Sequence, residues 1–200
     1  MSGSPTAPQV PAPVVVVMGV SGAGKSTLMA ALAERLGWAQ LDGDDLHPAA
    51  NVEKMRRGEP LTDADRGPWL AAVGRWIDES RAENAPCLLA CSALKRGYRE
   101  SLRTGRPGLR FVWLTGDRKV LHRRLAERTG HFAGPQILDS QLTTLEPPTD
   151  EADVICVDLT LPTELQVDCV LETLGLKTSS APAPRPVEGG PQSGPGTRRD

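Results

Sequence analysis

The sequence predicts an α/β protein with one parallel, five-stranded sheet and helices on both faces. Two observations lead to this expectation: apolar runs of strand length alternate with helical segments, and the first run contains no polar residue. A strand without polar alternation is typical of a sheet that is buried on both sides, as parallel sheets are.

In chain order, the first strand is expected at residues 14–18, a run of four valines and a methionine. A helix follows over 25–36, where Leu28, Leu32 and Leu36 recur at helical spacing. A second strand is expected at 38–41, and a short helix around 51–57. A long helix is then expected to begin near Asp65, with Pro68 tolerated in its first turn.

The second half of the chain repeats the alternation. Apolar runs predict strands at 87–91, 109–114 and 154–157. Between and after them, helices are expected at 95–103, 119–128, 136–145 and 162–174. Residues 129–135, which are rich in glycine and end in proline, are interpreted as a loop.

Glycine and proline are concentrated at the two ends of the chain. Half of the 18 prolines lie in residues 1–13 and 177–200. We therefore expect disordered tails there and a single domain over residues 14–176.

The net charge, the apolar runs and the cysteines of the chain argue against several classes of protein. The net charge of −2 argues against general nucleic-acid binding, and no apolar run reaches the roughly 18 residues of a membrane span. The N-terminus does not resemble a secretory signal. The four cysteines form no C-x-x-C pair and are expected to be free thiols, so a cytoplasmic location is predicted.

The strongest motif is Gly-Val-Ser-Gly-Ala-Gly-Lys-Ser at residues 19–26, which matches G-x-x-x-x-G-K-[ST] between a buried strand and a helix. The glycines let backbone N–H groups approach phosphate oxygens closely. Lys25 is expected to reach the β- and γ-phosphates of ATP, and the Ser26 hydroxyl to ligate Mg²⁺. The predicted nucleotide-binding residues are Gly19, Val20, Ser21, Gly22, Ala23, Gly24, Lys25, Ser26 and Thr27. The alternative, a chance glycine-rich turn, is disfavoured by this context.

A group of aspartates at residues 42–45 follows the second strand. Ligands gather at the carboxyl ends of parallel strands, so these carboxylates are expected beside the phosphate loop. Asp42 is predicted to complete the Mg²⁺ site with Ser26. Asp44 is predicted to orient a substrate hydroxyl and accept its proton. A turn or capping cluster is the alternative.

Basic residues recur at the predicted strand–helix junctions, where some of them would bind an anionic phosphoryl acceptor. They are Lys54, Arg66, Lys95, Arg96 and Arg99. For each one alone, a solvated surface charge is the alternative. Arg124 and Arg128 share a helical face and predict a small helical lid over about 118–136 that closes on the nucleotide. A salt-bridged surface helix is the competing interpretation.

Five segments in order resemble the gluconokinase family, small P-loop kinases with a nucleoside-monophosphate-kinase-like fold. They are residues 18–27, 41–70, 91–103, 124–132 and 140–158. The most specific are the D-G-D-D-L-H-P run and the P-L-T-D-A-D-R-G-P-W-L run. The resemblance implies transfer of phosphate from ATP, with Mg²⁺, to D-gluconate in a cytoplasmic homodimer that feeds sugar acids into the pentose phosphate or related pathways.

The resemblance also implies roles for particular residues. Lys25, Asp44, Arg124 and Arg128 would be catalytic. The substrate-binding residues would be Asp44, His47, Lys54, Arg66, Lys95, Arg99 and His131.

Three alternatives remain open from the sequence. They are a kinase of another small hydroxy acid such as shikimate, a nucleotide-binding regulator without turnover, and a nucleic-acid kinase. The aspartate-rich segments weigh against the first, and the retained P-loop and acidic residues weigh against the second. The acidic balance of residues 14–176 weighs against the third.

Overall fold

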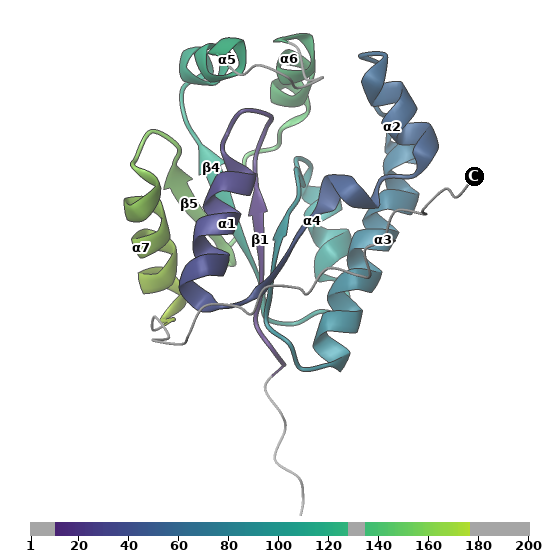
Figure 1. The fold of residues 1–200 in the computed structure, drawn as a ribbon. Helices are drawn as coiled ribbons and strands as arrows, with labels where there is room; N and C mark the ends of the chain where they lie inside the picture. The colour runs from purple at the N-terminus through teal and green to yellow at the C-terminus, as the bar shows by residue number, and fades with distance from the viewer. Residues whose placement is uncertain (1–10, 128–134, 177–200) are drawn as a thin grey trace, which may run out of the picture.

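The computed structural model describes residues 11–127 and 135–176, in which one sheet lies between two layers of helices (Figure 1). Its five strands are all parallel and run in the order β2-β3-β1-β4-β5. The predicted fold class is thereby confirmed. The strands are β1 (Val14–Met18), β2 (Ala39–Asp42), β3 (Cys87–Ala90), β4 (Leu109–Thr115) and β5 (Val154–Asp158).

The central strand β1 explains why its sequence shows no polar alternation. Val14, Val16 and Met18 face one hydrophobic core and Val15 and Val17 face another, and all five are buried. The first core is covered by α3 (Asp63–Ala82) and α4 (Arg96–Arg103), and the second by α1 (Lys25–Leu36) and α7 (Thr163–Leu174) (Figure 1). Each valine buried in this way contributes about 1.5–3 kcal/mol relative to exposure.

Helix α3 begins two residues earlier than expected. Thr62 caps it: its hydroxyl accepts the Asp65 backbone N–H, and the Asp65 carboxylate accepts the Thr62 backbone N–H in return. Pro68 therefore lies in the second turn, and its expected place in the first turn was wrong. Because proline has no N–H, the helix forgoes one backbone hydrogen bond there.

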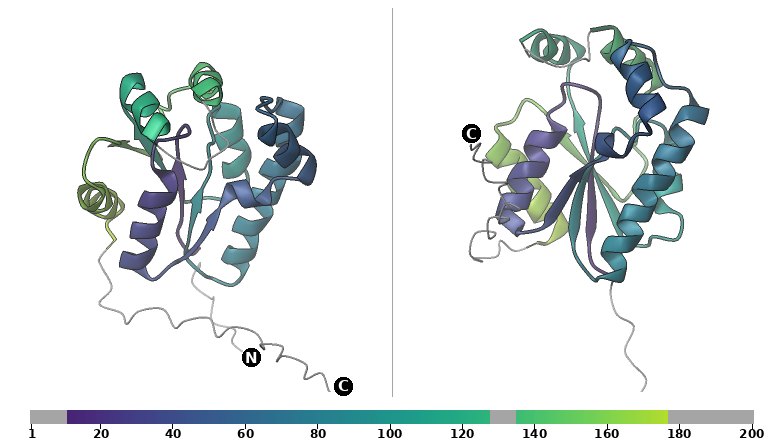
Figure 2. Two further views of the ribbon diagram at one scale, coloured as in Figure 1. Left: turned by 45° about the horizontal axis from the view of Figure 1, so that its top comes forward. Right: turned by 45° about the vertical axis from the view of Figure 1, so that its right-hand side comes forward.

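The remaining helices lie at the carboxyl edge of the sheet (Figure 2). A short 3-10 turn, η1 (Gly43–Leu46), and α2 (Ala49–Arg56) follow β2. Helices α5 (Arg118–Glu127) and α6 (Pro135–Thr144) cover the edge above β1, where the lid is predicted. Within the described residues, no helix combines the length and the hydropathy that crossing a membrane requires.

Some predicted features lie wholly or largely outside the described residues. They are the first ten residues of the N-terminal tail, the C-terminal tail 177–200, and most of the loop expected at 129–135. The expected free thiols are present at all four cysteines. Cys87 and Cys91 are buried and Cys156 is exposed.

Candidate active site

The phosphate loop joins β1 to α1 and depends on its glycines. Gly19, Gly22 and Gly24 all have positive φ angles, of +143°, +80° and +101°, which side chains on L-residues disfavour. A Cβ atom at Gly19 would also lie 2.9 Å from the Leu114 carbonyl oxygen. The loop is therefore held in a wound conformation in which its backbone N–H groups can converge on an anion.

Lys25 opens α1 at the end of this loop. Its Nζ donates to the carbonyl oxygen of Val20 at 3.3 Å, so the ammonium group folds back over the loop. Ser26 follows, and its hydroxyl donates to Asp42 Oδ2 at 2.9 Å. The structure thus brings together the two residues that were predicted to ligate a metal.

The turn after β2 is fixed on both sides. Gly43 is buried, and a Cβ atom there would lie 2.7 Å from the Ala90 carbonyl oxygen at the end of β3. Its own carbonyl accepts the indole N–H of Trp69 at 2.7 Å, and Asp42 accepts the Asp44 backbone N–H at 3.1 Å. The two carboxylates, Asp42 and Asp44, are therefore positioned by the backbone between them.

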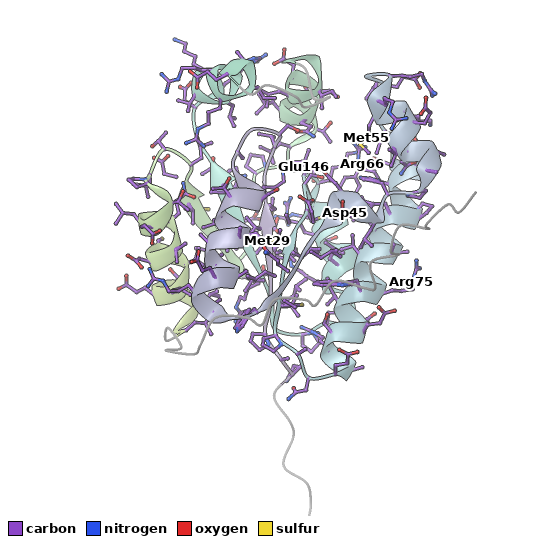
Figure 3. The ribbon with its side chains drawn as sticks, viewed as in Figure 1. Met29, Asp45, Met55, Arg66, Arg75 and Glu146 are labelled. Atoms are coloured by element: carbon purple, nitrogen blue, oxygen red, sulfur yellow. The ribbon has the colours of Figure 1, made fainter. Side chains whose placement is uncertain are left out.

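A cleft of about 620 Å³ opens between the phosphate loop and helices α2, α3 and α6. It is lined by Lys25, Asp44, His47 and Arg66, which were all predicted as site residues. Figure 3 labels Arg66 and Met55 on the side of α3 and α2 that faces α6. The cleft thus joins the phosphate loop to the predicted acceptor side.

Asp44 lines this cleft, and its surroundings act on its pKa in opposite directions. Although its side chain is solvent-accessible, the surrounding protein displaces bulk water, and this desolvation raises the pKa of Asp44. Lys25 opposes that change, whereas Asp42 and Asp45 reinforce it. A carboxylate with a raised pKa is a better match for accepting a hydroxyl proton.

His47 is held as a neutral imidazole. Its ring stacks on Trp69 at a centroid distance of 4.4 Å, and burial, reinforced by the nearby Arg66, lowers its pKa to about 4. Asn51 Nδ2 donates to the Asp65 carbonyl oxygen and lies 3.3 Å from His47 Nδ1. Because that amide nitrogen can only donate, Nδ1 accepts and the ring proton sits on Nε2. The Nε2–H group lies 3.9 Å from Asp44 Oδ1.

Two of the predicted cations of the acceptor side, Lys54 and Lys95, are engaged by carboxylates. Lys54 donates to Asp65 at 2.7 Å, and Lys95 contacts both oxygens of Asp63 at 2.8 and 2.9 Å. Arg66 donates instead to the Leu61 carbonyl oxygen at 2.5 Å. Across the described ranges, no carboxylate lies within ion-pair distance of Arg66, which lines the cleft.

Arg99 is a correction to the predicted site. Its side chain is fully buried outside the cleft lining, and its guanidinium group binds Glu151 and the carbonyl oxygens of Ala93, Leu94 and Glu146. The hydrogen bonds from Arg99 lower the pKa of Glu151 to about 2. Every guanidinium nitrogen is occupied, so Arg99 supports the backbone instead of binding an acceptor.

Arg124, in the segment where the lid is predicted, lies beside the phosphate loop. Its guanidinium group donates to the Leu159 carbonyl oxygen at 2.7 Å and to the Ala23 carbonyl oxygen at 3.4 Å. Arg128 and His131 lie outside the described residues.

Polar residues of the cleft region that were missed by the sequence analysis include Asn51, Arg56, Ser92 and Gln141. Ser92 follows β3 directly, so its place at the carboxyl end of a strand could have identified it. The other three are polar residues of ordinary helices, and nothing in the sequence marks them.

Comparisons with known proteins agree with this geometry. A family model described as an AAA domain matches residues 14–148. The thermoresistant gluconokinase of Escherichia coli (strain K12) is 47% identical over 162 residues, which cover 80% of this chain and 93% of that protein. The gluconokinase of Gluconobacter oxydans (strain 621H) is 50% identical over 160 residues, covering 80% and 88%. The crystal structure of a gluconokinase from Sinorhizobium meliloti 1021 matches with a TM-score of 0.73 at 47% identity, covering 82% and 91%.

Proposed function

The chain belongs to the gluconokinase family, and from that premise we propose how it transfers the γ-phosphoryl group of ATP to the 6-hydroxyl of D-gluconate. The observation that supports this reaction best is that Lys25, Asp44 and Arg66 line one cleft together. Phosphoryl transfer needs the donor phosphate, a proton acceptor and the anionic acceptor in one water-poor space.

On the donor side, the N–H groups of the phosphate loop bind the phosphate oxygens and Lys25 reaches the β- and γ-phosphates. Arg124, beside Ala23, neutralises charge that develops during transfer. Arg128 is proposed for the same task on the resemblance alone.

Ser26 and Asp42 fit a magnesium site. Their oxygens lie 2.9 Å apart, close to the about 3 Å between adjacent ligands of an octahedral ion with bonds of about 2.1 Å. Hydroxyl and carboxylate oxygens are the ligands that Mg²⁺ prefers. When bound, Mg²⁺ withdraws negative charge from the phosphate oxygens.

On the acceptor side, Asp44 orients the 6-hydroxyl and takes its proton. Arg66 binds the gluconate carboxylate, because it is the cleft-lining predicted cation that has no carboxylate partner among the described residues. Neutral His47 donates its Nε2–H to a substrate hydroxyl. Lys54 and Lys95 act by fixing the start of α3 through Asp65 and Asp63. His131 remains a proposed ligand on the resemblance alone.

We also propose that residues 14–176 form the whole kinase domain and that the enzyme is a cytoplasmic homodimer. Removal of the tails 1–13 and 177–200 is expected to leave turnover unchanged, and light scattering measures the oligomeric state. A monomer with full activity would contradict the dimer.

The reaction is tested by ADP release from the purified chain with ATP and Mg²⁺. D-gluconate is expected to give turnover, whereas shikimate, glucose, glycerate and AMP are expected to give the background rate. Equal rates with shikimate would support a kinase of another hydroxy acid. ATP binding without substrate-dependent ADP release would support a nucleotide-binding regulator.

A further inference from the structure

Gln141 links α6 to the phosphate loop, although 120 residues separate it from the loop in sequence. Its side-chain Oε1 accepts the backbone N–H of Ser21 at 2.6 Å. Both residues line the cleft together with Lys25 and Asp44. The side chain of Gln141 therefore stands where the donor phosphate and the acceptor must meet.

The contact with Ser21 determines which way the amide points. A backbone N–H can only donate, so the atom of Gln141 that faces it must be the oxygen and not the nitrogen. The Nε2 group is consequently directed away from Ser21. It makes no hydrogen bond to any part of the chain that the structure describes. Two N–H donors are thus presented to the cleft.

The base of α6 is held firmly, which keeps this amide in place. Glu146 is the second residue after the helix, and Figure 3 labels it below α6. Its backbone N–H donates to Leu94 at 2.9 Å, its carbonyl accepts from Arg99 at 3.0 Å, and its carboxylate accepts the Arg96 backbone N–H at 2.6 Å. α6 is therefore anchored at its base to the segment after β3 and through Gln141 to the phosphate loop.

We propose that Gln141 is a catalytic residue whose Nε2–H group donates to a non-bridging oxygen of the phosphoryl group in transit. This inference rests on the proposed function. The 6-hydroxyl oxygen forms the new bond to phosphorus, and the bond from phosphorus to the β–γ bridging oxygen breaks. ADP leaves with that electron pair, and the hydroxyl proton passes to Asp44. Gln141 neither gains nor loses a proton. Its Nε2–H group stabilises, by a hydrogen bond, the negative charge that develops on the phosphoryl oxygens during transfer.

The test compares Gln141→Glu with Gln141→Ala in the full chain. Gln141→Glu keeps an oxygen that can accept the Ser21 N–H but replaces the donor with a negative charge. We expect kcat to fall on the order of 100-fold in both variants, the loss typical of one preorganised donor. The affinity for ADP, measured by calorimetry, and the KM for D-gluconate are expected to stay within about threefold, because the amide acts on the transition state.

Thr143→Glu is the matched control, because Thr143 is exposed on the same helix and this variant gains the same charge. Its kcat is expected to stay close to that of the wild type. Retained kcat in Gln141→Glu would overturn the inference and make Gln141 a structural link to Ser21. A parallel loss of ADP affinity in both Gln141 variants would do the same.

Wild-type turnover with D-gluconate, measured in the same assay, separates two failures. Absent wild-type turnover overturns the proposed function and this inference with it. Wild-type turnover together with full activity of Gln141→Glu overturns the inference alone.

Discussion

The two walls of the cleft differ in the groups that they present: backbone N–H groups on one side and side chains on the other. The phosphate loop presents backbone N–H groups, and its shape is imposed by glycines at positive φ. The opposite wall, which we call the acceptor wall (residues 47–69), presents side chains whose availability depends on their partners. A binding site made of backbone N–H groups can therefore be predicted from a short sequence motif. A binding site made of side chains depends on contacts that form only in the folded protein.

The largest effect is expected on the loop side. Lys25→Ala is expected to lower kcat at least ~10³-fold, because no other side chain replaces the ammonium group on the phosphates. The unfolding midpoint in urea should stay near that of the wild type. ADP release and urea unfolding measure the two quantities. A folded variant with undiminished turnover would remove Lys25 from the mechanism.

Arg99 tests whether a cation of the acceptor side is structural. Arg99→Met is expected to lower the free energy of unfolding by about 3–5 kcal/mol. It removes the buried partner of Glu151, which keeps only the more exposed Arg103 and Arg96, and it leaves three backbone carbonyl oxygens without their donor. Urea unfolding measures this change. The double variant with Glu151→Gln is expected to recover part of the loss, since the buried charge is then absent. A raised KM for D-gluconate at unchanged stability would instead return Arg99 to the substrate site.

Asp44 lies where the two walls of the cleft meet, and comparing it with its neighbour Asp45 tests its proposed role as the proton acceptor. Asp44→Asn is expected to lower kcat on the order of 100-fold with little change in ATP affinity, because the proton acceptor is lost. Asp45 is exposed and outside the cleft lining, so Asp45→Asn is the control (Figure 3). If Asp44→Asn weakened ATP binding at unchanged kcat, Asp44 would belong to the metal site instead.

The smallest expected effect is on substrate binding by the acceptor wall. Arg66→Gln is expected to raise the KM for D-gluconate about 10–100-fold, the range of a lost hydrogen bond to a charged group. The KM for ATP should not change. Arg75→Gln is the matched control, because Arg75 is exposed on the outer side of the same helix (Figure 3). Equal KM values for D-gluconate in the two variants would contradict the proposal that Arg66 binds the gluconate carboxylate.

The same contrast explains what could be predicted from the sequence. The bounds of β1 and α1 were predicted correctly, because a buried valine run and the phosphate-loop motif constrain their backbones locally. The start of α3 was misplaced because the capping pair Thr62 and Asp65 was not recognised. That pair is a local signal and could have been used.

The acceptor side shows where such prediction ends. Lys54, Arg66 and Arg99 all satisfied the expectation of a basic residue near a strand–helix junction. Arg99 meets Glu151 across 52 residues of sequence, and Gln141 meets Ser21 across 120. Pairings at such separations arise only when the chain has folded, so residue type alone could not distinguish a binding group from a structural one.

The acceptor wall is also one uninterrupted stretch of chain between β2 and β3. It contacts the rest of the protein at the Gly43 turn, where Trp69 binds the backbone, and at Asp63, which accepts from Lys95 and Tyr98. A new acceptor preference can therefore be sought by exchanging this stretch as a block. Any transplanted segment must preserve the hydrogen bond between the Trp69 indole and the Gly43 carbonyl and the carboxylate of Asp63.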